Sequence, residues 1–141
     1  MKLTPLAMVV AACWVTKEFY PLSSFPMYSS FDDRTYLTYL QSPSGEPLAT
    51  VTAVNMVSSQ LKKRYGDGLE DLDEQYEGSH FDWSAEQKRP AGLATIDYLR
   101  EVHAPAAFRG GQLDGVRLID LRLFLEDGKL VRKEEPIAEV R

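Results

Sequence analysis

The feature that most constrains the fold is the pair Asp127-Gly128, which lies between two strand-like runs near the end of the chain. Asp-Gly is a preferred pair for a two-residue type I′ turn, because both central residues of that turn need a positive φ. In the resulting register the facing pairs are Leu125 with Leu130 and Glu126 with Lys129. The sequence therefore predicts an antiparallel hairpin over about residues 115–140.

The first strand of this hairpin alternates along its length, so its two sides differ in composition. One side carries Ile119, Leu121, Leu123 and Leu125, and the other mixes Asp120 and Arg122 with Phe124. Alternation with period two indicates a strand with one side in the core and the other in water, so we expect the leucine side to be buried. Pro136 indicates that the second strand lies at an edge of the sheet or is broken there.

A second hairpin is predicted over about residues 33–54. Thr35–Gln41 is rich in aromatic and β-branched residues, Ser42–Pro47 is rich in turn formers, and Leu48–Val54 is the expected returning strand. Together the two hairpins predict an antiparallel sheet. With the helices expected between them, the fold class is α+β.

Two helices are predicted between the hairpins, at about residues 57–76 and 91–103. Asn55 is a candidate N-cap of the first, and Gly66 a candidate residue just beyond a helix end. Residues 77–90 show no period and are expected to form a loop. The second helix follows Pro90, and its expected buried face consists of Leu93, Ile96, Leu99 and Val102.

Residues 1–18 hold the longest hydrophobic stretch, LTPLAMVVAACWV at residues 3–15, with no charge between Lys2 and Lys17. A membrane anchor is the first interpretation, although a helix of this length spans about 22 Å against a hydrocarbon core of about 30 Å. A buried core helix and a cleaved signal peptide are the alternatives. We divide the chain into an anchor at 1–18, a joint at 19–31 and an α+β domain at 32–141.

The joint is uncharged and contains two prolines, Pro21 and Pro26, which end any helix by about Tyr20. Rings with one polar edge suit a membrane interface, so aromatic residues here are candidates for contact with the membrane interface or a partner. The alternative is an extended arm packed in the core. The candidate residues are the aromatic residues of the joint together with Trp14, which precedes it, and the apolar Met27: Trp14, Phe19, Tyr20, Phe25, Met27, Tyr28 and Phe31.

Composition narrows the function classes. A hydrophobic content of 44% with 26% charged residues is typical of a globular domain, and a net charge of −5 argues against general nucleic-acid binding. Cys13 lies in the apolar run, where a thiol is unreactive. The acidic stretch from Asp67 to Glu74 lacks the order of a calcium loop, and we expect no metal, cofactor or catalytic residue.

YPLSSFPMYSSF, residues 20–31, resembles the Y-P-F-S-x-F-P-M-Y-S motif of small, uncharacterised bacterial membrane-associated proteins in which one hydrophobic helix precedes the motif. Leu22 stands where Phe is usual. Similar segments elsewhere are SGEPL, SSQLKKRY and VRLIDLRLFLEDGKLV. Such sequences occur alongside multi-pass membrane proteins related to vitamin K-dependent carboxylases, and the resemblance implies an accessory role and assigns no catalytic residue.

We therefore expect a non-enzymatic accessory protein in the inner (cytoplasmic) membrane. It would cross the bilayer once, contact membrane lipid and associate with a larger integral membrane protein. Lys2 before the run and Glu18 after it favour a domain outside the cytoplasm. The alternative is a soluble ligand-binding or enzymatic domain whose pocket lies between helix 91–103 and the sheet, lined by Tyr36, Tyr39, Tyr98 or His103.

Overall fold

The computed structural model describes residues 34–141. The predicted hydrophobic helix at residues 1–18 and the joint at residues 19–31 lie outside the described residues, as do all seven interface candidates. Among the described residues, no helix is both long enough and apolar enough to cross a bilayer.

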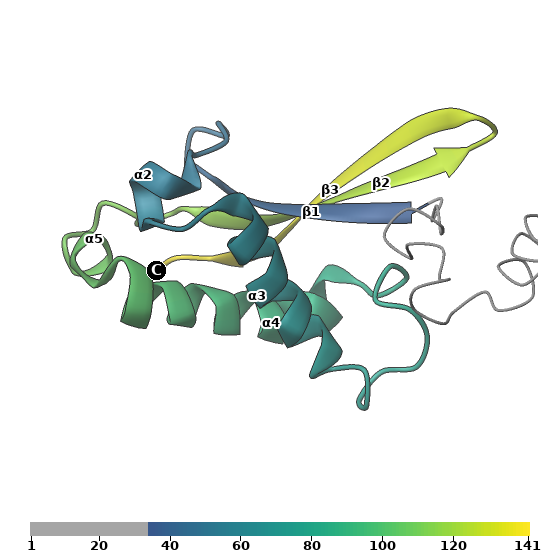
Figure 1. Ribbon diagram of the computed structural model, residues 1–141, viewed down its shortest axis with the longest axis horizontal. Helices are drawn as coiled ribbons and strands as arrows, with labels where there is room; N and C mark the ends of the chain where they lie inside the picture. The colour runs from purple at the N-terminus through teal and green to yellow at the C-terminus, as the bar shows by residue number, and fades with distance from the viewer. Residues whose placement is uncertain (1–33) are drawn as a thin grey trace, which may run out of the picture. The chain divides into compact units, whose positions relative to one another are not determined.

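The described residues form an α+β unit around one antiparallel sheet of three strands (Figure 1). The strands are β1 (Arg34–Gln41), β2 (Arg117–Glu126) and β3 (Lys129–Glu139), in the order β1-β2-β3. The hairpin predicted at 115–140 is confirmed, and Leu125 faces Leu130 as expected. Asp127 and Gly128 have φ values of 49° and 72°, as a type I′ turn requires.

The returning strand predicted at residues 48–54 is wrong. These residues contain the whole of the short helix α2 (Thr50–Val54). The expected pairing is reduced to an isolated bridge between Gln41 and Pro47. β1 pairs instead along its whole length with β2, from Arg34 opposite Phe124 to Gln41 opposite Arg117. Thr50 and Val54 are buried one helical turn apart, so tertiary packing overrides the β propensity of this segment.

Helix α3 (Ser58–Glu70) lies within the helix predicted at 57–76. Its buried residues Leu61, Tyr65 and Leu69 recur every four positions, which places them on one face. Asn55 is not its N-cap: it ends α2 with a φ of 52°. The helix also continues past Gly66 to Glu70, so Gly66 does not mark its end.

Helix α4 (Ala85–Tyr98) begins earlier than the helix predicted at 91–103, and part of the expected loop is helical. Ser84 and Gln87 form a capping box, in which each side chain accepts a hydrogen bond from the other residue's backbone N–H. Pro90 lies inside the helix near its start. A π-helical turn, η2 (Leu99–His103), and a short helix, α5 (Pro105–Arg109), follow.

The buried face of α4 differs from the predicted one. Ile96 and Leu99 are buried as expected, but Leu93 and Val102 are 42% and 58% exposed. Lys88, Ala91, Gly92 and Thr95 complete the buried face. A Cβ at Gly92 would lie 2.6 Å from Ile137 Cγ2, so the absence of a side chain there lets α4 approach β3 closely.

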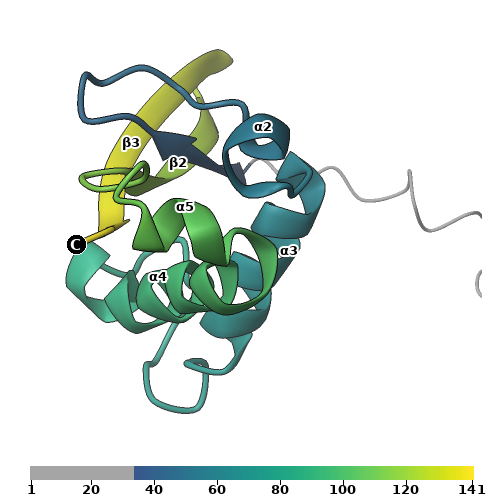
Figure 2. The same ribbon diagram turned by 90° about the vertical axis from the view of Figure 1, so that its left-hand side faces the viewer.

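Helices α3 and α4 pack on the same side of the sheet (Figures 1 and 2). This helix-facing side carries Tyr36, Thr38, Leu40, Leu118, Asp120 and Arg122. The predicted burial of β2 is therefore wrong at Asp120 and Arg122, which are buried, and at Leu125, which is exposed, whereas Ile119 is buried as expected. The opposite side, which we call the leucine face, consists of Leu37, Tyr39, Ile119, Leu121, Leu123, Leu125 and Leu130.

Pro136 lies in β3, which is an edge strand of this sheet as the sequence predicts. The register shifts here: Ile119 pairs with Pro136 and Leu118 pairs with Ala138, so Ile137 is an extra residue. Ile137 and Ala138 are both buried as a result. A bulge of this kind accommodates a proline that has no N–H to donate, and it lets two successive side chains enter the core.

Candidate functional site

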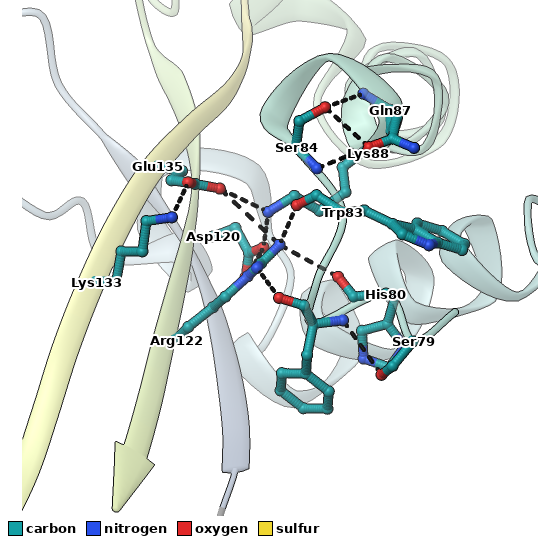
Figure 3. Close-up of polar contacts among 11 residues, drawn as sticks. Ser79, His80, Trp83, Ser84, Gln87, Lys88, Asp120, Arg122, Lys133 and Glu135 are labelled. Carbon is teal, nitrogen blue, oxygen red and sulfur yellow. Dashed lines mark hydrogen bonds and ion pairs between the residues drawn. The ribbon is translucent and has the colours of Figure 1, made fainter. Parts of the chain in front are cut away.

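The most concentrated group of charged side chains lies between α4 and the sheet. Its members, which we call the Lys88 cluster, are Lys88, Asp120, Arg122 and Glu135. Lys88 Nζ lies 2.7 Å from Asp120 Oδ2 and 2.8 Å from Glu135 Oε2, and the Lys88 side chain is 0% exposed (Figure 3). Two cations meet two anions here, so the cluster is electrically balanced.

Arg122 connects this cluster to the loop before α4. Its guanidinium donates to the carbonyl oxygens of His80, Phe81 and Trp83, and Figure 3 shows it directed at that loop. Its Nε lies 3.2 Å from Asp120 Oδ2. One side chain therefore satisfies three backbone acceptors and a carboxylate, which fixes the loop against β2.

Glu135 is the member of the cluster nearest to solvent. Partial burial alone would raise its pKa, but hydrogen bonds from Lys133 and Lys88 and the charges of Lys88 and Arg122 hold the pKa at about 2. Lys133 Nζ lies 2.8 Å from Glu135 Oε1. The carboxylate thus stays ionised at neutral pH and serves as a permanent counterion.

Acid-base or nucleophilic chemistry needs a reactive group that a substrate can reach. The Lys88 amine and the Asp120 carboxylate are almost fully buried, and each is bound to an oppositely charged partner. Burial raises the pKa of the neighbouring Tyr65 phenol, and the Asp120 charge raises it further. This arrangement suits a structural role in holding α4, β2 and β3 together.

A groove of about 630 Å³ lies between α4 and β3, in the region where the sequence predicts a pocket. Its floor is apolar, and four arginines line it: Arg89, Arg100, Arg117 and Arg141. Three of them are paired with carboxylates, in the pairs Arg89–Glu86, Arg100–Asp97 and Arg117–Glu139. None of the four residues expected to line a pocket is in this groove.

The structure separates those four expected residues. Tyr36 packs edge-on against Tyr65 on the helix-facing side, and Tyr39 lies on the leucine face. Only Tyr98 and His103 come together, with ring centroids 5.3 Å apart. They line a smaller pocket of about 190 Å³ beside α3, together with Met56, Gln60, Lys63, Arg64 and Asp67.

The leucine face lies largely outside the hydrophobic core. Leu37, Leu125 and Leu130 are 47%, 56% and 70% exposed. Near its middle Glu134 accepts a hydrogen bond from Arg132, which lowers the pKa of Glu134. Burial raises the pKa of Tyr39, and Glu134 raises it further. The face is therefore an apolar surface with a small polar group on it.

The sequence did not predict the Lys88 cluster. The available signal was the placement of Asp120 and Arg122 two residues apart in an otherwise apolar strand, which puts opposite charges on one side. Lys88 itself gives no such signal. Within residues 34–141, no group of three or more His, Cys, Asp or Glu side chains is arranged to hold a metal ion.

Comparisons of the chain with protein-family models, with curated proteins and with solved structures gave no match.

Proposed function

We propose that this protein is a non-enzymatic accessory protein, anchored by residues 1–18 in the inner (cytoplasmic) membrane, that docks onto a larger integral membrane protein. The observation that carries this proposal is the leucine face, whose exposed apolar side chains lie on a rigid sheet. Exposed apolar surfaces on soluble domains often mark sites of contact with other proteins or membranes.

The location of the exposed leucines supports a partner at the membrane. Arg34, where the domain begins, pairs with Phe124, next to the turn of the β2–β3 hairpin. Leu125 and Leu130 flank the same turn. The chain therefore enters the sheet at the end where the two most exposed leucines lie, so an anchored domain would present this end within reach of a membrane-bound partner.

The chemistry of the face defines the partner. The exposed ion pair of Arg132 and Glu134 lies on the edge strand β3, opposite Leu123 and Leu121, so the face fits an apolar surface that offers a few hydrogen bonds. We propose that the partner contributes such a surface from a part outside its membrane-spanning helices. A domain outside the cytoplasm is consistent with the charges that flank residues 3–15.

Fractionation with a carbonate wash tests the anchor. The full-length chain is expected to remain with the membranes, and a version that begins at Phe19 is expected to appear in the supernatant. Recovery of the full-length chain in the supernatant, or identical partitioning of the two versions, would refute the anchor.

A photo-crosslinking amino acid in the full-length chain tests the docking surface. At position 130 it is expected to crosslink one integral membrane protein, and at position 62, on α3, it is expected not to. Substitution of Leu37 and Leu125 by Ser should abolish the product from position 130 without unfolding the domain. Equal crosslinking from both positions would contradict docking through the leucine face.

The groove between α4 and β3 favours a second candidate function, the binding of an organic anion with an apolar body. Its apolar floor and arginine-lined rim are complementary to such a ligand. Titration with decanoate, followed through the methyl NMR signals of Leu93 and Ile96, distinguishes the two functions. Saturable shifts would favour ligand binding, and unchanged signals would leave docking as the function.

A further inference from the structure

A second feature, independent of the leucine face, lies where α3 meets the π-helical turn η2. This pocket of about 190 Å³, which we call the Arg64 pocket, has more hydrogen-bond donors than acceptors in its lining. Lys63 and Arg64 bring two positive charges and Asp67 one negative charge. The chain as a whole has a net charge of −5, so the local excess of positive charge runs against the overall composition.

Arg64 has unused hydrogen-bonding capacity. Its guanidinium lies over the ring of Tyr98, with Cζ 4.8 Å from the centroid, which fixes the orientation of the side chain. Its Nε is buried and has no hydrogen-bond partner in the described part of the chain. Within residues 34–141, no carboxylate lies within ion-pair distance of this guanidinium. A buried donor without a partner is costly unless a ligand or solvent satisfies it.

His103 is held on the opposite side of the pocket by two backbone features. Its Nδ1 lies 3.3 Å from the carbonyl oxygen of Asn55, which can only accept, so the proton lies on Nδ1. Asn55 presents that oxygen from a left-handed conformation with a φ of 52°. His103 also ends η2, and π-helical turns of this kind occur frequently at functional sites.

We propose that the Arg64 pocket binds a phosphate group through Arg64 and Lys63, with the Gln60 side-chain amide as a further donor and the His103 ring as a wall of the site. A guanidinium offers paired N–H donors that match the geometry of phosphate oxygens, and the pocket volume admits a group of that size. Met56, which is 3% exposed, closes the base. Asp67 reduces the net positive charge of the pocket. The site therefore favours a single anionic group held by directed hydrogen bonds, and not an extended negatively charged surface.

Phosphate could reach this pocket as the free ion or as part of a lipid headgroup. NMR titration of the full-length chain in dodecyl maltoside micelles, first with inorganic phosphate and then with glycerophosphoglycerol, separates the two. Saturable shifts at Arg64, Tyr98 and His103 with inorganic phosphate indicate the free ion. Saturable shifts with glycerophosphoglycerol alone indicate a headgroup. The absence of saturable shifts with both probes would overturn the proposal.

Substitutions identify the side chains that bind phosphate. Arg64→Gln is expected to weaken phosphate binding at least about tenfold, since it removes a charge-assisted hydrogen bond. Lys63→Gln, at an exposed position, is expected to weaken binding by a smaller factor. Arg109→Gln, outside this pocket, is the matched control and is expected to bind as the parent does.

A circular dichroism spectrum checks that Arg64→Gln is folded, and Lys63→Gln, at an exposed position, replaces it as the decisive variant if it is not. Phosphate binding by the folded decisive variant with the affinity of the parent would overturn the proposal. So would an equal loss of affinity in Arg109→Gln.

Discussion

The two sides of β2 differ in burial, and the more polar side is the more deeply buried one. The side that carries Asp120 and Arg122 faces the helices and is buried, whereas the side that carries Leu121, Leu123 and Leu125 lies largely outside the core. Charges can enter a core when each has a partner, and here Lys88, Glu135 and three backbone carbonyls provide the partners. The leucines at the hairpin end remain exposed, and these are the side chains that we propose a partner covers.

The comparison teaches that the stability and the proposed function of this domain use different sides of one strand. Substitutions on the helix-facing side should change the free energy of unfolding and leave the docking surface intact. Substitutions at the exposed leucines of the leucine face, Leu37, Leu125 and Leu130, should do the opposite.

The largest effect is expected from Lys88→Met, which removes the closer of the two cations that Asp120 and Glu135 share and leaves only Arg122 in contact with both. Breaking a buried ion pair by removing one partner costs about 3–5 kcal/mol in the free energy of unfolding. Urea denaturation followed by circular dichroism measures this loss. Lys129→Met at the exposed turn is the control and should change the free energy by less than about 0.5 kcal/mol. Equal stability of the two variants would show that the Lys88 cluster contributes nothing.

The next effect compares two leucines of the same strand. Leu118→Ala should lower the free energy of unfolding by about 3 kcal/mol, because Leu118 is 0% exposed and the change leaves a cavity. Leu125→Ala should lower it by less than about 0.5 kcal/mol, because Leu125 is 56% exposed. The same urea titrations serve here, and the opposite order of effects would place the core on the wrong side of β2.

A smaller effect is expected from acid. The pKa of Glu135 is about 2 in the folded chain, below the ordinary value of 4.5, so ionisation favours folding. The stabilisation is fully present above about pH 4.5 and is lost as the pH falls toward 2, with a total of about 2 kcal/mol. Glu135→Gln should flatten the pH dependence of the free energy of unfolding between those values. Glu126→Gln, at an exposed position near the turn, should leave the dependence unchanged.

The smallest effect concerns the start of the helix that supplies Lys88. Ser84→Ala removes the capping-box hydroxyl of α4 and should lower the thermal midpoint by the equivalent of about 1 kcal/mol. Ser59→Ala, at an exposed position in α3, is the control and should stay within about 0.5 kcal/mol of the parent. A Ser84→Ala variant as stable as the control would show that the cap does not limit α4.

Much of the local structure was predictable from sequence because it depends on neighbouring residues. The turn at Asp127-Gly128 requires two positive φ values, and that requirement fixed the β2–β3 register. The spacing of Leu61, Tyr65 and Leu69 likewise agrees with the predicted helix. These elements needed no knowledge of what they pack against.

The errors about the sheet and its burial concern long-range packing, whereas the late start predicted for α4 is a local error, since Ser84 and Gln87 have the spacing of a capping box. Leu48–Val54 has strand propensity, but its residues from Thr50 form helix α2, which buries Thr50 and Val54, and β1 pairs with β2, far along the chain. The burial of Asp120 was not predicted because Lys88, whose position in sequence gives no hint of burial, compensates its charge. Of the four residues expected to line one pocket, only Tyr98 and His103 lie close together in the described part of the chain. Their contact depends on the turn η2.

The most direct test of the central claim measures which leucine methyl groups of β1 and β2 are accessible to solvent. Methyl-labelled full-length chain in micelles would be titrated with a soluble gadolinium chelate, and paramagnetic broadening recorded by NMR. The account predicts strong broadening at Leu37 and Leu125 and protection of Leu40 and Leu118. Protection of Leu37 and Leu125 together with broadening of Leu118 would contradict it.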